Sequence, residues 1–156
     1  MRPARVPVGL HLAQAARVVS RGFDQALATA GGSLPVWLVL LNIKTRQLAN
    51  QRELAEAVGI REATLTHHLN AMEADGLITR RRHEANRRIH IVQLTDAGDA
   101  TFLRLRDAAI AFDRRLRRGL TDTELAALGD ALNQLAANVG GADGQLPWAG
   151  LAADRS

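Results

Sequence analysis

The chain is 156 residues long, carries a formal net charge of +4 and contains no cysteine. This length fits one domain with a sizeable core, and the lack of cysteine excludes disulfides, thiolate zinc sites and thiol redox sensing. No apolar run approaches the roughly 20 residues of a membrane-spanning helix, and the first residues, MRPARVPVGLH, lack the apolar region and cleavage site of a secretory signal. We therefore expect a cytoplasmic protein that binds no membrane. Periodic segments rich in Leu and Ala predict a mainly α-helical fold.

Two helices are predicted before residue 50. Apolar residues at helical spacing indicate a helix over residues 8–30, which Gly31 and Gly32 end. Ser33 and Pro35 mark the next helix start, because proline is tolerated in a first turn. The sequence PVWLVLLNIK that follows is apolar around most of its circumference, which predicts a buried central helix.

Residues 50–95 predict a helix, a tight turn, a second helix and two short strands. Asn50 with Glu53 three residues later is typical of an N-cap with a capping-box partner. Gly59 stands at the turn, and the second helix, over residues 62–75, is again followed by a glycine. Two short runs with strand character then enclose an arginine-rich loop. Two helices at a sharp turn, followed by a basic hairpin, are typical of a DNA-binding unit.

The hairpin concentrates the positive charge. Between Thr79 and His90 the chain has five arginines against one acid, Glu84. Such a run is often only a solvated loop. Its position between two strands, directly after a helix-turn-helix pattern, favours contact with nucleic acid instead. The arginines are Arg80, Arg81, Arg82, Arg87 and Arg88.

Two further amphipathic helices are predicted after the hairpin. Thr95 is placed to cap a helix from about Asp96 to Arg118, and Thr121 with Glu124 forms a capping box for the last helix. The helices at both ends of the chain carry more apolar surface than the small DNA-binding unit can cover. They serve either as intramolecular support or, as we expect, to form a homodimer, because paired readers contact half-sites about 34–36 Å apart on a pseudo-palindromic operator.

The order of these elements resembles the MarR family of winged helix-turn-helix regulators. The resemblance extends from about Leu10 to Val139 and rests on the motifs ELAEAVGI, TLTHHLNAMEADGLITR, NRRIHIVQLTDAG and LTDTELAAL. It implies one domain over residues 1–156, mainly α-helical, with a two-stranded β wing and long terminal helices that form a dimer. Its parts would be dimerisation helices at 8–30 and 96–139, a winged helix-turn-helix lobe at 35–94 and a flexible tail at 140–156.

The resemblance also implies a function and one local departure. Members of the family commonly act as repressors that small, often aromatic, anionic or toxic molecules release from DNA. The wing of the family usually carries Asp-x-Arg, whereas this chain has Asn86, Arg87 and Arg88 at these positions. Arg88 keeps the arginine that the family inserts into the minor groove. Asn86 lacks the charge of the aspartate but is able to hydrogen-bond its own turn.

The second helix of the motif separates into a buried and a reading face at 100° per residue. Leu65, Leu69 and Met72 define the buried face, and the first residues of a recognition helix approach base edges. His68 is predicted at the boundary of the buried face. The opposite, outward face and its flanks supply the candidate DNA contacts Ala63, Thr64, Thr66, His67 and Asn70, of which Asn70 would pair with adenine or reach phosphate.

The arginines are assigned by strand alternation and by position. Arg80 and Arg82 share one strand face and, with Arg52 near the start of the first motif helix, are predicted phosphate contacts. Arg87 and Arg88 at the wing tip are predicted to enter an adjacent minor groove, most readily a narrow A·T-rich one. Ordinary solvated positions are the alternative for all of these residues.

The small-molecule site rests on the resemblance, which places it between the dimer helices and the DNA-binding lobe. His11, Trp37 and His68 match that location, with plain core packing as the alternative. A constitutive or architectural DNA-binding regulator without a ligand switch has the same motifs. The other class considered is an enzyme with His67 or His68 as its general base. The sequence offers no nucleophile and orienting group to act with either histidine, and no phosphate-binding glycine loop. We therefore expect no enzymatic activity, no cofactor and no zinc site.

Overall fold

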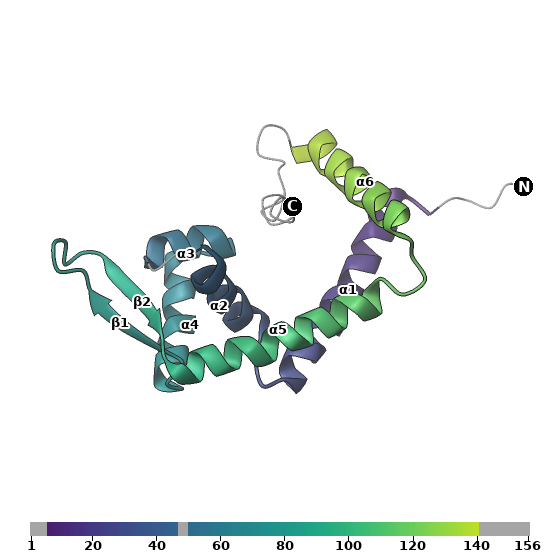
Figure 1. Cartoon of the computed structure of the whole chain (residues 1–156). Coiled ribbons are helices and arrows are strands. Elements are labelled where there is room, and N and C mark those ends of the chain that lie inside the picture. The colour runs from purple at the N-terminus through teal and green to yellow at the C-terminus, as the bar shows by residue number, and fades with distance from the viewer. Residues whose placement is uncertain (1–5, 47–49, 141–156) are drawn as a thin grey trace, which may run out of the picture. The chain divides into compact units, whose positions relative to one another are not determined.

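The computed structural model describes residues 6–46 and 50–140, and the chain divides into two compact units, residues 1–116 and residues 117–156. Among these described residues, the first unit contains five helices and a hairpin, and the second contains one helix (Figure 1). The elements in chain order are α1 (Val8–Thr29), α2 (Leu34–Arg46), α3 (Gln51–Val58), α4 (Glu62–Ala74), β1 (Ile78–Arg82), β2 (His90–Leu94), α5 (Asp96–Leu116) and α6 (Asp122–Gly140).

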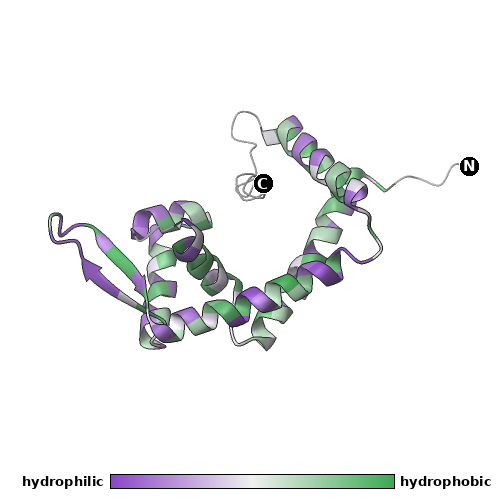
Figure 2. Cartoon of the chain, viewed as in Figure 1, coloured by the Kyte–Doolittle hydropathy of each residue, from purple (hydrophilic) through white to green (hydrophobic). Residues whose placement is uncertain are grey.

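The core of the first unit forms around α2. Trp37, Val39 and Leu40 are buried there, as the apolar circumference of this helix predicted. In Figure 2, α2 is largely green, whereas the β1 arrow is mostly purple. The Trp37 ring stacks on Phe102 of α5 at a centroid distance of 5.7 Å, which fixes α2 against α5.

Helices α1 and α5 pack along only part of their length. The Phe23 and Phe112 rings lie 5.2 Å apart, and Gly22 lets the Phe112 ring approach the α1 backbone closely. Leu27 near the end of α1 is fully buried. The first half of α1 is exposed, although the predicted apolar stripe continues through it. Among the described residues of the first unit, this first half of the stripe therefore has no packing partner.

No single helix in the two described ranges is long and apolar enough to cross a membrane. Only α1 and α2 taken together satisfy the length and composition of a span, and they are bent by 78° at their junction.

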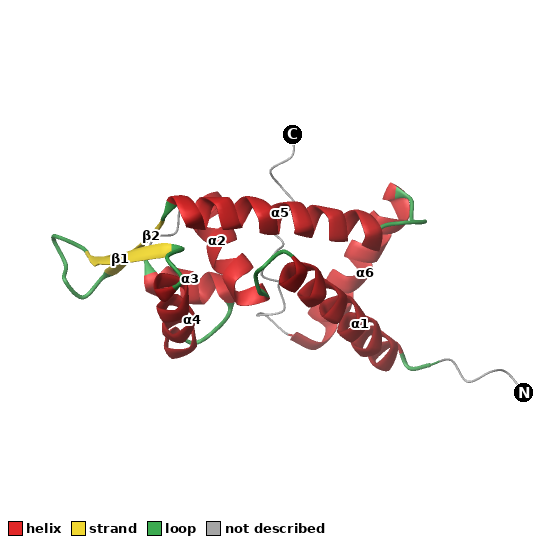
Figure 3. Cartoon of the chain, turned by 90° about the horizontal axis from the view of Figure 1, so that it is seen from below, coloured by secondary structure: helices red, strands yellow, loops and turns green. Residues whose placement is uncertain are grey.

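The wing is an antiparallel hairpin that is locked to the start of α5. Its register pairs Ile78 with Leu94 and Arg82 with His90. The Thr95 hydroxyl accepts from the Gly98 amide at 3.1 Å, so Thr95 caps α5 as predicted, and it donates to the Gly76 carbonyl at 2.6 Å. The hairpin extends away from the helices, as Figures 1 and 3 show.

The predicted capping box of the last helix is present. The Thr121 hydroxyl accepts from the Glu124 amide at 3.2 Å, and the Glu124 carboxylate accepts from the Thr121 amide at 2.8 Å. The Thr121 backbone amide, and then its hydroxyl, lower the pKa of the Glu124 carboxyl below its ordinary value.

The capping box gives a pH-dependent prediction for Glu124→Gln. A carboxyl whose pKa is lowered by folding stabilises the fold above its unfolded-state pKa, near 4.5, and this contribution disappears as the pH falls through the folded-state value. The wild type should therefore melt at a higher temperature than the variant at pH 7, and the difference should shrink as the pH falls from 7 to the acid side of 4.5. Thermal unfolding of both proteins across this range measures it; a constant difference would contradict the assignment.

Candidate nucleic-acid interface

The helix-turn-helix is built by local signals that the sequence displays. The Asn50 side chain caps α3 by accepting from the Arg52 amide at 2.8 Å. Gly59 adopts a φ of 75°, in the left-handed region that ends helices. The Ile60 amide then donates to the Ala55 carbonyl at 3.1 Å, which closes the turn into α4.

The faces of α4 are those that the 100° step predicted. Leu65, Leu69 and Met72 are buried with at most 1% exposure. His68 is half-buried at the boundary of this face, again as predicted. The residues exposed on the outward side include four of the candidate DNA contacts, namely Ala63, Thr64, His67 and Asn70.

Thr66 has a different environment from its neighbours. It is half-buried, and its hydroxyl accepts from the Gln51 side-chain amide at 2.6 Å while donating to the Glu62 carbonyl at 2.9 Å. These bonds tie the start of α4 to the start of α3. Gln51 was not among the predicted functional residues, and no local pattern marks it.

The wing arginines differ in how much of each is accessible. Arg82 is exposed, but the Arg80 side chain is only 18% exposed because it lies against α4. Its guanidinium hydrogen-bonds Glu73 and Asn70. The hydrogen bonds from the Arg80 side chain, together with its charge, hold the pKa of the Glu73 carboxyl below its ordinary value. Glu73 was also absent from the predicted site.

The turn of the wing is held by its own polar groups. The Asn86 side-chain oxygen accepts from the Arg88 amide at 3.1 Å, and the Asn86 carbonyl accepts from the Ile89 amide at 3.0 Å. Asn86 therefore stabilises its own turn, as predicted from its side-chain amide, although it lacks the negative charge of an aspartate. The Arg87 and Arg88 side chains are exposed at this turn.

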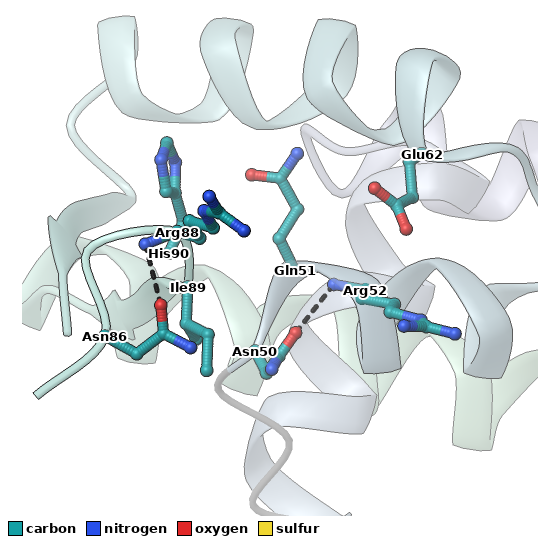
Figure 4. A pocket seen from close by; sticks show the side chains of 8 residues that line it. All are labelled: Asn50, Gln51, Arg52, Glu62, Asn86, Arg88, Ile89 and His90. Atoms are coloured by element: carbon teal, nitrogen blue, oxygen red, sulfur yellow. Dashed lines mark hydrogen bonds between the residues drawn. The ribbon is translucent and has the colours of Figure 1, made fainter.

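The wing turn and the two motif helices surround a common cavity of about 580 Å³. Its lining includes Arg88 and His90 of the wing, Gln51 and Arg52 at the start of α3, and Glu62 at the start of α4 (Figure 4). A second cavity of about 270 Å³ is lined by Glu73, His90 and the three arginines of β1. Hydrogen-bonding side chains dominate both linings, which suits contact with a polar, anionic backbone.

The predicted small-molecule residues do not meet in the single chain. Trp37 is buried against Phe102, His68 is half-buried on α4, and His11 is exposed on the first half of α1. Neither of the two cavities described above includes any of them. Across residues 6–46 and 50–140, no three His, Asp or Glu side chains converge in a way that would hold a metal ion.

Comparison with known proteins identifies this architecture. The model of the MarR family matches residues 33–90. The HTH-type transcriptional regulator BilQ of Clostridium symbiosum (strain WAL-14163) is 31% identical over 109 residues, which cover 70% of this chain and 76% of BilQ.

Solved structures agree. The transcriptional repressor CouR, bound to a 23-mer DNA duplex, superimposes with a TM-score of 0.74 and 31% identity over 83% of this chain and 92% of CouR. The transcriptional regulator PA3341 superimposes with a TM-score of 0.70 and 30% identity over 86% of this chain and 98% of PA3341. This chain therefore belongs to the MarR family and is a DNA-binding transcriptional regulator with a winged helix-turn-helix fold.

Proposed function

We propose that this protein is a homodimeric, sequence-specific repressor that a small molecule releases from its operator. One observation carries the proposal of DNA binding. Arg88 of the wing turn, Arg52 at the start of α3 and Glu62 at the start of α4 line the same cavity, so the wing turn lies beside the starts of both motif helices. A duplex on this surface would meet the exposed residues of α4 with a major groove and the wing tip with the neighbouring minor groove. The repressor CouR, 31% identical, is bound to a DNA duplex in its solved structure.

In this proposal, the candidate contacts divide by accessibility. Ala63, Thr64 and His67 approach base edges, Arg52 and Arg82 hold phosphates, and Arg87 and Arg88 enter the minor groove. Thr66 holds α4 in place through its bonds to α3.

Exposed apolar side chains support the dimer. On α1, Leu12 and Val19 of the predicted stripe are 39% and 36% exposed, and Leu10 and Val18 are more exposed still. Leu128 of α6 is 50% exposed. Exposed apolar side chains at helical spacing fit burial against a second copy.

The experiment that tests this part combines footprinting with sedimentation. The full chain should protect a two-fold-related site in the DNA upstream of its own gene, with half-sites about one helical turn apart. It should sediment at twice the chain mass of 16.8 kDa. A monomer, or a protein that binds all duplexes equally, would contradict the proposal.

The ligand switch is proposed for a pocket that the second copy completes near His11, Trp37 and His68. His68 lies on the back of the reading helix, so a ligand that contacts it is able to bias the position of that helix. Small aromatic carboxylates are the chemical class to screen. Operator release should be detected by fluorescence anisotropy, and His11→Ala, at an exposed position of α1, should weaken the response while operator binding persists. If no ligand changes operator affinity, the protein is a constitutive regulator.

A further inference from the structure

We propose that Arg80 is a positioning residue that determines which hydrogen-bonding groups Asn70 offers to DNA, so that Asn70 reads guanine rather than adenine. The inference rests on the proposed DNA-binding function and concerns the specificity of the same surface. It also changes the expected role of Arg80, whose place on the strand had predicted a phosphate contact.

The bonds of Arg80 join the wing to the recognition helix. The Arg80 backbone amide donates to one Glu73 carboxylate oxygen at 3.1 Å. Its side chain donates to the other oxygen through Nε at 3.2 Å and through Nη2 at 2.7 Å. Because two nitrogens of the planar guanidinium donate to the same carboxylate, the orientation of its plane is fixed. The ammonium group of a lysine would not be fixed in this way.

The same guanidinium occupies the carbonyl of Asn70. Arg80 Nη2 donates to Asn70 Oδ1 at 2.5 Å. Asn70 and Glu73 are three residues apart on α4 and therefore lie on one side of the helix, where a single arginine is able to bind both. Asn70 itself remains exposed, so its side-chain NH₂ group is the part still free to contact another molecule.

The occupied carbonyl limits what Asn70 is able to recognise. Bidentate pairing with adenine requires the asparagine oxygen to accept from N6 while the nitrogen donates to N7. The N6 amino group of adenine would have to approach Asn70 Oδ1 beside the Arg80 guanidinium, which already donates to this oxygen. The remaining NH₂ group offers only donors, and guanine presents two neighbouring acceptors, N7 and O6, in the major groove.

Charge and exposure make Arg80 unsuitable as a phosphate contact. Glu73 neutralises it at 2.7 Å, and its side chain is 18% exposed. Arg82, which shares its strand face, is exposed. The two arginines are therefore expected to have different roles in DNA binding. Arg82 contributes salt-dependent affinity for any sequence, and Arg80 contributes to the choice of base.

The test is selection of duplexes from a random pool by the full-length wild type, Asn70→Ala, Arg80→Lys and Arg82→Gln. The wild type should prefer guanine at one position of each half-site. Asn70→Ala and Arg80→Lys should both reduce that preference about tenfold and leave other positions unchanged. Lysine keeps the positive charge but lacks the planar set of N–H donors with which Arg80 binds Glu73 and Asn70 together. Arg82→Gln, the matched control, should weaken binding to all sequences and lower the salt slope by about one.

Glu73→Gln provides a second variant in case Arg80→Lys folds poorly, since it weakens the anchor of Arg80 without altering Arg80 itself. It should relax the same position. Adenine at the position that depends on Asn70, or Arg80→Lys that selects like the wild type, would overturn the role of Arg80 alone. Uniform loss of affinity in Arg80→Lys would do the same. A wild type that selects no sequence would overturn the proposed function and this inference with it.

Discussion

Replacing Arg88 by alanine is expected to weaken operator binding by a factor of about ten or more, without loss of the fold. The Arg88 side chain is exposed at the wing turn and lines the cavity next to the starts of α3 and α4. A guanidinium in a narrow minor groove is stabilised by the strong negative potential there. A fluorescence anisotropy titration of the footprinted operator, at one fixed salt concentration, measures the loss.

The structure makes this substitution a clean probe. The bond that holds the turn goes from the backbone amide of Arg88 to Asn86, so alanine at position 88 preserves it. Arg88→Lys keeps the charge and should recover only part of the affinity if the planar guanidinium matters. Arg106→Ala on α5 is a matched control, because Arg106 is an exposed arginine paired with Asp107. Equal affinity of Arg88→Ala and wild type would refute the minor-groove assignment.

The elements could be predicted from the sequence wherever their boundaries depend on local chemistry. Asn50, Gly59 and Thr121 each act within a few residues of themselves, as an N-cap, a left-handed turn and a capping box. The faces of α4 followed from helical geometry alone, because a buried stripe needs only regular spacing. Asn86 stabilises its own turn by the same kind of local bond.

The contacts that set the site depend on packing between elements, which the spacing of residues within one element does not reveal. Strand alternation placed Arg80 and Arg82 on one face, yet Glu73 lies next to only the first of them in an ion pair. Likewise, Gln51 at the start of α3 donates to the Thr66 hydroxyl on α4, a contact between two helices that the spacing within either helix does not reveal. His11 is exposed on the first half of α1, and in the proposed dimer its surroundings would come from the second copy.

Gly98→Ala is expected to cost about 3 kcal/mol of folding free energy, because it places a methyl group against backbone. A Cβ at Gly98 would lie inside contact distance of the Leu77 carbonyl oxygen and 3.1 Å from its carbon. That carbonyl is not free to move: it accepts from the Thr95 amide at 3.1 Å, and the Leu77 amide is bonded to Met72 at 2.9 Å. The clash falls where the end of α4, the start of β1 and the start of α5 meet.

Chemical denaturation at one protein concentration measures the loss, since the stability of a dimer depends on concentration. Gly129→Ala is the matched control: Gly129 is exposed within α6, and a Cβ there meets nothing within 4 Å. That variant should gain about 0.5–1 kcal/mol from helix propensity. Because the junction at Gly98 carries the wing, Gly98→Ala should also reduce operator affinity while still folded. Wild-type stability in Gly98→Ala would mean that α5 and the wing are able to separate at little cost, and a rigid wing could then not be the basis of DNA recognition.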